Sequence, residues 1–328
     1  MIWVAAAAAV VAALGVATWF VLTQPVLARP GSATAAGDAC RGARPCALAL
    51  EEHVRALVAF APRSFDYPEN LDRAAAYVRG ELGHAGGVIS EQTFVVDGDT
   101  YRNVCVALGP DTPERIVVGA HYDAVEEGPG ADDNASGVAA LIALSGLLAK
   151  ETLRHRVELV AYSLEEPPNF ATAAMGSAAH AHRLKASGAR VIGMLCIESI
   201  GYFRDEPGSQ RFPIPFLGAW YPGRGDFIAV VSRVQDMRLV RTVKRAMLSA
   251  TALPVHSLNG PQAIPGVSFS DHRSYWDCGY PAVMITDTAR YRNPHYHTDT
   301  DLPMTLDYRR MALVVAGLRA AVLSLDAS

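Results

Sequence analysis

The chain has few cysteines and no excess of positive charge. Five cysteines in 328 residues are too few for a fold held together by disulfides. The 29 basic side chains are balanced by 33 acidic ones, for a formal net charge of −4. No basic stripe of the kind that binds nucleic acid is visible. We therefore expect a core stabilised by apolar burial and no nucleic-acid partner.

The cysteines fall into two groups. Cys40 and Cys46 lie close together in a polar segment and could close a small loop in an oxidising compartment. Cys105, Cys196 and Cys278 lie among apolar residues. Their surroundings predict buried thiols that pack like small hydrophobic side chains.

Charge is also missing from the first 28 residues, and residues 2–22 are almost entirely apolar. About 20 apolar residues are long enough to cross a bilayer as a helix. We expect an uncleaved membrane anchor with an extracytoplasmic catalytic domain, because the run exceeds the apolar region of a typical signal peptide and no Lys or Arg precedes it. The alternative is a signal peptide cleaved near Ala28, which would leave a secreted or periplasmic protein.

The remaining sequence predicts one α/β domain. Residues 1–28 form the anchor or signal segment, residues 29–46 are a small polar linker, and residues 47–328 form the catalytic domain. Half of the residues are hydrophobic, and apolar strand patterns alternate with helical ones. We expect strands at 92–96, 101–108, 115–120, 157–163, 191–197, 227–231 and 282–286, and helices at 47–61, 70–82, 137–149, 177–185, 237–249 and 306–325. This alternation predicts a three-layer α/β/α fold around a mostly parallel mixed sheet. Residues 203–225 are predicted to be a long surface loop.

Histidine and acidic residues follow three of the predicted strands. His121 and Asp123 end one strand, Glu165 and Glu166 follow the next, and Glu198 ends a third. Ligand-binding residues in an open α/β sheet gather beyond the carboxyl ends of the strands. Imidazole and carboxylate are suitable ligands for a Zn-type ion. The pattern predicts an enzyme that activates water with a metal.

Two loops add candidates: Asp132 and Asp133 open the helix at 137–149, and His295 and His297 lie in a late polar loop. Structural interpretations remain open for several of these residues. The aspartates could cap the helix, and the loop histidines could be ordinary surface residues. Glu198 is the hardest to explain structurally, because a carboxylate after an apolar strand is costly unless it is paired or metal-bound.

Together the motifs resemble the zinc exopeptidases of the bacterial leucyl aminopeptidase type, which are related to glutaminyl cyclases, over about residues 50–325. The matching segments are His121-Tyr122-Asp123-Ala124 with Gly130 to Gly137, Glu165-Glu166 with Gly176-Ser177, and Asn293 to Thr300. Ser270-Asp271-His272 and Gly279 to Ala282 also match family positions.

The resemblance implies a zinc peptidase of the phosphorylase/hydrolase-like fold with two Zn²⁺ ions per chain. Its five ligands would be Asp133 as the bridge, His121 and Glu198 for one ion, and Glu166 and His297 for the other. The catalytic residues would be Glu165, as general base, and Asp123, placed behind His121.

The sequence departs from the family pattern at two places. Many members have Asp at the position of Glu198, which leaves full occupancy of that metal site open. The loop 167–175 is longer than usual in the family, so substrate specificity does not carry over.

The function implied is a metal-dependent exopeptidase, foremost an aminopeptidase that removes N-terminal residues of peptides through a metal-activated water. A glutaminyl cyclase-type acyltransferase, a carboxypeptidase or dipeptidase, and a non-catalytic binding ectodomain are the alternatives. The intact Asp-Asp-Asn-Ala-Ser-Gly motif at 132–137 argues against the cyclase. No ligand is plainly lost, which argues against a non-catalytic protein.

The aromatic residues of the 203–225 loop have two interpretations. They either line a hydrophobic substrate pocket or are ordinary loop packing; these residues are Phe203, Phe212, Phe216, Trp220 and Tyr221.

Overall fold

The fold is built on a mixed eight-stranded sheet, seen in a computed structural model that describes residues 13, 15–26 and 43–328. The strand order is β1-β2-β4-β3-β5-β8-β6-β7. The strands are β1 (Val88–Val96), β2 (Asp99–Leu108), β3 (Glu114–His121), β4 (Arg156–Tyr162), β5 (Arg190–Glu198), β6 (Ile228–Ser232), β7 (Val255–Asn259) and β8 (Ala282–Thr286). The pairs β4-β3, β3-β5, β5-β8 and β6-β7 are parallel, and the other three are antiparallel. The predicted mostly parallel mixed sheet is confirmed.

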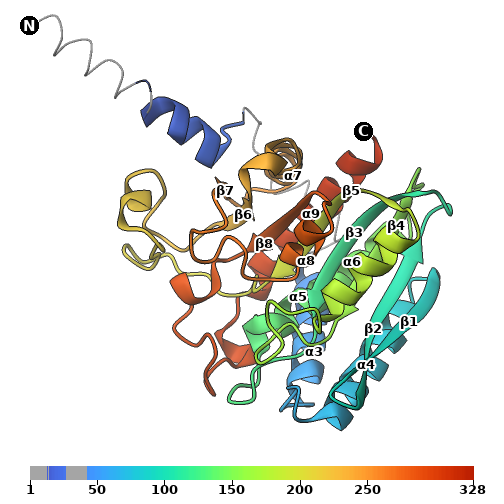
Figure 1. Cartoon of the computed structure of the whole chain (residues 1–328). Helices are drawn as coiled ribbons and strands as arrows, with labels where there is room; N and C mark the ends of the chain where they lie inside the picture. The colour runs from blue at the N-terminus through green and yellow to red at the C-terminus, as the bar shows by residue number, and fades with distance from the viewer. Residues whose placement is uncertain (1–12, 14, 27–42) are drawn as a thin grey trace, which may run out of the picture.

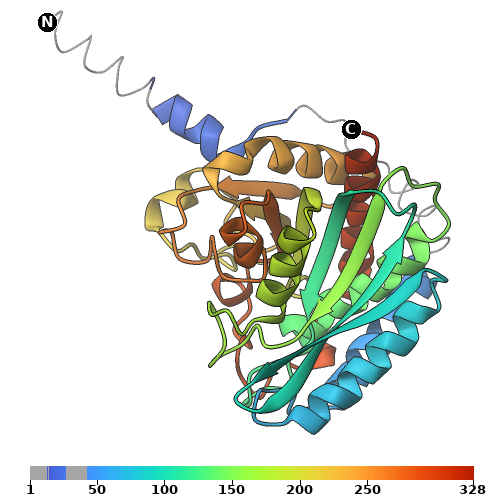
Figure 2. The same cartoon turned by 45° about the vertical axis from the view of Figure 1, so that its right-hand side comes forward.

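Helices cover both faces of the sheet, as Figures 1 and 2 show. One apolar core joins the sheet to α3 (Ala43–Val58), α4 (Pro68–Gly83), α5 (Gly137–Leu148), α7 (Met237–Ala250) and α9 (Tyr308–Asp326). A second core on the opposite face includes α6 (Gly176–Ala186) and α8 (His272–Asp277). The central strands β3, β4 and β5 are almost wholly buried, which explains their unbroken apolar sequences. The predicted three-layer α/β/α fold is confirmed.

Local sequence explains the edge hairpin β1-β2. The two strands are joined at Asp97 and Gly98, which have φ values of 51° and 96°. Two-residue hairpin turns favour Asp-Gly because both central residues need positive φ. The exposure of β1 alternates along its length, so only one of its faces contributes to the core.

Two elements were missed by the sequence patterns. Strand β7 and helix α8 are five and six residues long, and both carry polar residues that hide their periodicity. The loop 203–225 is less superficial than predicted, since it contains a 3₁₀ turn at Pro215–Ala219 whose Leu217 is buried. Helix α3 begins at Ala43, inside the segment predicted as linker.

The described part of the N-terminal segment corrects one prediction. Among the described residues, no helix is long and apolar enough to span a membrane. The predicted membrane anchor, and the localisation based on it, is therefore wrong for the chain as the structure describes it. The helical stretch in this segment ends at Thr23, and Thr23 and Gln24 are buried against the domain. Cys40 lies outside the described residues, so its pairing with Cys46 stays a prediction.

Candidate metal centre

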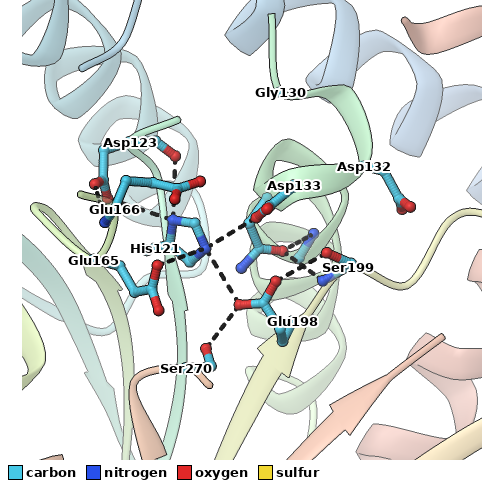
Figure 3. A network of polar contacts seen from close by, with 12 residues as sticks. His121, Asp123, Gly130, Asp132, Asp133, Glu165, Glu166, Glu198, Ser199 and Ser270 are labelled. Atoms are coloured by element: carbon cyan, nitrogen blue, oxygen red, sulfur yellow. Dashed lines mark hydrogen bonds and ion pairs between the residues drawn. The ribbon is translucent and has the colours of Figure 1, made fainter. Parts of the chain in front are cut away.

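The carboxyl ends of three parallel strands meet at one edge of the sheet. His121 is the last residue of β3 and Glu198 the last of β5, while Glu165 and Glu166 follow the end of β4 at Tyr162. Strand β3 lies between β4 and β5 and runs parallel to both. The topology therefore brings residues far apart in the sequence to one place, where Figure 3 shows them clustered around His121.

A first group of ligand-type atoms surrounds the imidazole of His121. Its Nε2 atom lies 3.2 Å from Glu198 Oε2 and 3.3 Å from Asp133 Oδ1. Glu165 Oε2 lies farther away, at 3.8 Å. One nitrogen and two carboxylate oxygens from three separate segments thus converge on one point, an arrangement that suits a divalent cation.

A second group shares Asp133 with the first. His297 Nε2 lies 3.1 Å from Asp133 Oδ2 and 3.3 Å from Glu166 Oε2. Since Asp133 Oδ1 faces the first group, the two oxygens of this carboxylate serve different groups. Asp133 therefore contributes one carboxylate oxygen to each group, and its role as a bridge between two ions stays a prediction.

The residues of the centre fit a pair of divalent cations. Three polar atoms in it are buried without a hydrogen-bond partner in the described structure: His121 Nε2, Asp133 Oδ1 and Glu166 Oε1. An unpaired buried polar atom is costly, and an uncompensated buried carboxylate costs more. Cations would satisfy all three atoms at once.

The tautomer of His121 is set by its surroundings. Its Nδ1 atom lies 3.2 Å from the backbone carbonyl oxygen of Asp123 and 3.4 Å from the Asp123 carboxylate. Because a carbonyl oxygen only accepts hydrogen bonds, Nδ1 carries the proton and Nε2 keeps its lone pair. Asp123 also accepts a hydrogen bond of 2.9 Å from the Glu166 backbone N–H. It thus lies behind the centre and links two of its segments, as such supporting groups do at metal sites.

Crowding of carboxylates shifts the pKa values of the centre when no cation is bound. Burial raises the pKa of Glu165 well above its ordinary value, and the charges of Glu166 and Glu198 raise it further against the opposing effect of His121. Burial also raises the pKa of Glu166 to about 7. Burial alone would lower the pKa of His297, but hydrogen bonds with Asp133 and Glu166 raise it to about 10. The centre therefore holds protons that cations would displace.

The adjacent Asp132 has a structural role. Its side chain points away from His121 in Figure 3 and accepts hydrogen bonds of 2.8 Å from the Gly201 backbone N–H and from Asn293 Nδ2. It thereby ties the end of β5 to the loop that carries His297. Neither Asp132 nor Asp133 caps helix α5, because the N–H of Gly137 at its start is bonded to Asn134 Oδ1 instead.

The remaining candidates from the sequence, His295 and three cysteines, lie outside the two ligand groups. The ring of His295 bonds Thr300 Oγ1 at the surface, and among the described residues it joins no ligand group. Cys105, Cys196 and Cys278 are buried, as predicted for small apolar side chains.

Four buried residues in or near the centre were given no role by the sequence reasoning. Ser270 Oγ donates a 2.7 Å hydrogen bond to Glu198 Oε2, the oxygen that faces His121, while Ser199 Oγ donates one of 2.9 Å to Oε1. Arg63 is fully buried and donates to the backbone carbonyls of Leu57, Tyr122, Pro129 and Gly130. Asp271 is buried with both oxygens unpartnered in the described structure, and burial raises its pKa to about 7. Only Ser270 and Asp271 had a signal in the sequence, the Ser-Asp-His motif.

An apolar cavity of about 100 Å³ opens beside the centre. Glu198 and Tyr296 line it, together with the apolar side chains of Phe227, Met284 and Phe269. From the 203–225 loop, Phe212, Leu217 and Tyr221 line it. The other loop aromatics do not: Phe203 packs near the guanidinium groups of Arg292 and Arg310, and Phe216 packs edge-on against Trp220. Part of the loop thus lines a cavity and part of it is ordinary loop packing, and the use of the cavity by a substrate stays a prediction.

The fold and the paired ligand groups define the class of this protein as a metal-dependent peptidase of the α/β/α type. Residues 103–322 match the model of peptidase family M28, so the chain belongs to that family. It is 45% identical over 278 residues to the uncharacterized protein YfbL of Escherichia coli (strain K12), covering 82% of this chain and 85% of that protein.

Two further similarities bear on the type of peptidase and on the fold. The chain is 28% identical over 224 residues to leucine aminopeptidase 1 of Trichophyton equinum, covering 64% of this chain and 54% of the relative, so it spans about half the length of that enzyme. The fold is shared with the LapA aminopeptidase of Legionella pneumophila, with a TM-score of 0.71 at 17% identity over 93% of this chain and 78% of the other. The family and these relatives bear out the prediction of a metal-dependent peptidase of the aminopeptidase type.

Proposed function

We propose that the chain is a two-zinc aminopeptidase that hydrolyses the first peptide bond of substrates with a free α-amine. The observation that carries the proposal is the pair of ligand groups that share Asp133, with Glu165 beside them and an apolar cavity adjoining them. The ligands would be His121 and Glu198 for one ion, Glu166 and His297 for the other, and Asp133 for both. Histidine and carboxylate donors without sulfur are typical of catalytic zinc.

In this proposal Glu165 is the general base. It is buried at the centre, and its Oε2 is 3.8 Å from His121 Nε2, farther than the oxygens of Asp133 and Glu198. When bound, the metal pair supplies Lewis-acid polarisation of the scissile carbonyl and a lowered pKa for the attacking water. Glu165 takes the proton of that water and passes it to the leaving amine.

The cavity supports a preference for apolar first residues. It is lined by Glu198, a proposed ligand of the centre, and by Phe227, Met284 and the loop residues Leu217 and Tyr221. A substrate whose scissile bond lies at the metals would direct its first side chain into this space. Full burial of a Leu or Phe side chain is worth about 1.5–3 kcal/mol, or roughly a tenfold to hundredfold gain in kcat/KM.

The test is a panel of Leu-, Phe-, Ala- and Glu-linked chromogenic amides, each with a free and an N-acetylated amine, with metal analysis of the same sample. We expect cleavage of the free amines only, fastest for Leu and Phe, with two zinc ions per chain. Equal cleavage of blocked and free substrates would contradict the aminopeptidase assignment. Ring closure of N-terminal glutamine without hydrolysis, together with one ion per chain, would indicate the cyclase reaction instead.

A further inference from the structure

A buried lysine on the outer layer of the domain is bonded mainly to backbone carbonyls. Lys244 of α7 is 7% exposed. Its Nζ donates to the carbonyl oxygens of Thr23, at 2.7 Å, and Gln24, at 3.3 Å, and to Ser257 Oγ at 3.2 Å. No carboxylate among the described residues lies within ion-pair distance of it. An ammonium group withdrawn from water needs such acceptors, and two of its three come from the N-terminal segment.

Other contacts hold the same few residues of that segment. Ser257 Oγ donates a 2.6 Å hydrogen bond to the carbonyl oxygen of Thr23. The guanidinium of Arg241 lies 4.9 Å from the ring centre of Phe20, and Leu22 and Gln24 are buried with Thr23. Both Figure 1 and Figure 2 show the N-terminal helix beside α7, at the β6-β7 end of the sheet. The end of this helix is thus docked on the domain by polar and apolar contacts together.

The docked residues lie directly behind one wall of the apolar cavity. Tyr221 and Ser257 line the cavity, and Tyr221 Oη donates to the carbonyl oxygen of Ser257 at 2.7 Å and to that of Leu22 at 3.4 Å. The ring of Tyr221 packs against Phe212 and His256, which also line the cavity. Tyr221 therefore contacts the cavity with its ring and the N-terminal segment with its hydroxyl group.

We propose that residues Leu22–Gln24 are a specificity-determining element, which sets the preference for large apolar first residues by holding the Tyr221–Ser257 wall of the cavity in place. The inference rests on the proposed function, in which this cavity receives the first side chain of the substrate. The segment is more than 10 residues from the α3 helix in sequence and touches no metal ligand. Its contribution is therefore to substrate binding and not to the chemical step.

Lys244→Met tests the docking in the full chain, because methionine fills most of the lysine volume but cannot bond Thr23 and Gln24. Arg245→Met is the matched control, since Arg245 is the exposed neighbour on the same helix. Hydrogen exchange of residues 19–26 measures how firmly the segment is docked. KM and kcat for Leu-, Phe- and Ala-linked amides measure how the Tyr221–Ser257 wall affects substrate binding and turnover. For Lys244→Met we expect faster exchange and a KM raised about tenfold for Leu and Phe. KM for Ala, and kcat for all three, should stay within twofold of the unmodified enzyme, as should every value for the control.

Tyr221→Phe provides an independent second variant. It keeps the ring in the cavity and removes only the hydroxyl bridge, so KM for Leu and Phe should rise about threefold with kcat unchanged. Unchanged exchange in Lys244→Met, or faster exchange without a change in the Leu-to-Ala preference, would overturn the inference and leave the proposed function intact. An unmodified enzyme that cleaves none of the free-amine substrates would overturn the proposed function itself.

Discussion

Two neighbouring glutamates with different surroundings make the sharpest test at the scale of single residues. Glu166 lies 3.3 Å from His297 Nε2, and its backbone N–H donates to Asp123, whereas Glu165 Oε2 lies 3.8 Å from His121 Nε2, farther than the nearest oxygens of Asp133 and Glu198. We expect Glu165→Gln to lower kcat by roughly a hundredfold or more, the usual loss when a general base is removed, while two ions per chain remain. Glu166→Gln should lose the ion on the His297 side as well as activity.

Metal quantification beside steady-state kinetics distinguishes the two variants. The circular dichroism spectrum of each should match that of the unmodified protein, since both substitutions preserve side-chain volume. If both variants keep their metals and their activity, the roles assigned to this pair are wrong.

Ser270 affords a second test at this scale, because it contacts the carboxylate of Glu198 directly. The hydroxyl of Ser270 bonds the oxygen of Glu198 that faces His121, and Ser199 bonds the other. Both carboxylate oxygens are thus held in position, which lowers the entropy lost on metal binding. Ser270→Ala should weaken binding of one ion about tenfold to hundredfold, the usual effect of losing a supporting contact at a metal site.

Competition with a chromogenic chelator measures that affinity. Ser187→Ala, at an exposed position just after α6, should bind both ions like the unmodified protein. Ser270→Thr keeps the hydroxyl group and should restore part of the affinity. Equal affinity in Ser270→Ala and the unmodified chain would show that Glu198 needs no such support.

At the scale of elements, the turn that delivers Asp133 depends on Gly130. This residue has a φ of 62°, and a Cβ atom there would overlap the backbone carbonyl oxygen of Asp133 and the side chain of Ala124. Gly130→Ala should therefore displace the bridging carboxylate, with loss of metal and of activity. The positive φ adds about 1–2 kcal/mol of strain.

Gly208→Ala is the control that separates the backbone strain of a positive φ from the steric overlap of an added Cβ atom. Gly208 has a φ of 81°, but a Cβ there would have nothing within 4 Å. We expect this variant to be slightly less stable but to keep both metals and full activity. If Gly130→Ala kept metal affinity like Gly208→Ala, the turn would tolerate a side chain and would not control the position of Asp133.

At the scale of the whole molecule, acid stability depends on a buried cluster on the second core. Glu158 of β4 lies 2.8 Å from Arg156 Nε and 3.4 Å from His180 Nε2. Burial alone would raise the pKa of Glu158, but His180, Arg156 and Arg115 together lower it to about 2 from an ordinary value of 4.5. The ionised carboxylate therefore stabilises the fold above about pH 4.5. That contribution is lost as the pH falls toward 2 and corresponds to roughly 3 kcal/mol.

Glu158→Gln should lower the free energy of unfolding by about that amount at pH 7 and flatten its dependence on pH between about 4.5 and 2. Urea unfolding at a series of pH values measures both effects. Glu114→Gln, which removes a partly exposed ion pair with Arg190, should change stability by less than about 1 kcal/mol. An unchanged pH dependence in Glu158→Gln would assign the acid sensitivity to other groups.

Much of this protein was predictable from its sequence, because the relevant signals are local. The apolar runs before His121 and Glu198 are continuous because β3 and β5 are buried on both faces, and burial on both faces leaves no polar alternation. The ligands follow these runs directly, since an open α/β sheet binds ligands beyond the carboxyl ends of its strands. The site therefore depends on where strands stop, which the sequence marks with a change from apolar to charged residues.

The remaining features were decided only by the tertiary structure, because they depend on partners far away in the chain. Strand β7 is a strand because it pairs with β6, and its own five residues have too few apolar positions to reveal it. Ser270 acquires its role from Glu198, 72 residues away, and Lys244 from Thr23, 221 residues away. The apolar N-terminal segment suggested a membrane anchor, and only the folded chain shows that the end of this segment, Leu22 to Gln24, is buried on the domain. A buried side chain must contact a suitable partner, apolar or hydrogen-bonding. The sequence shows the type of side chain, and only the folded chain determines which residue is its partner.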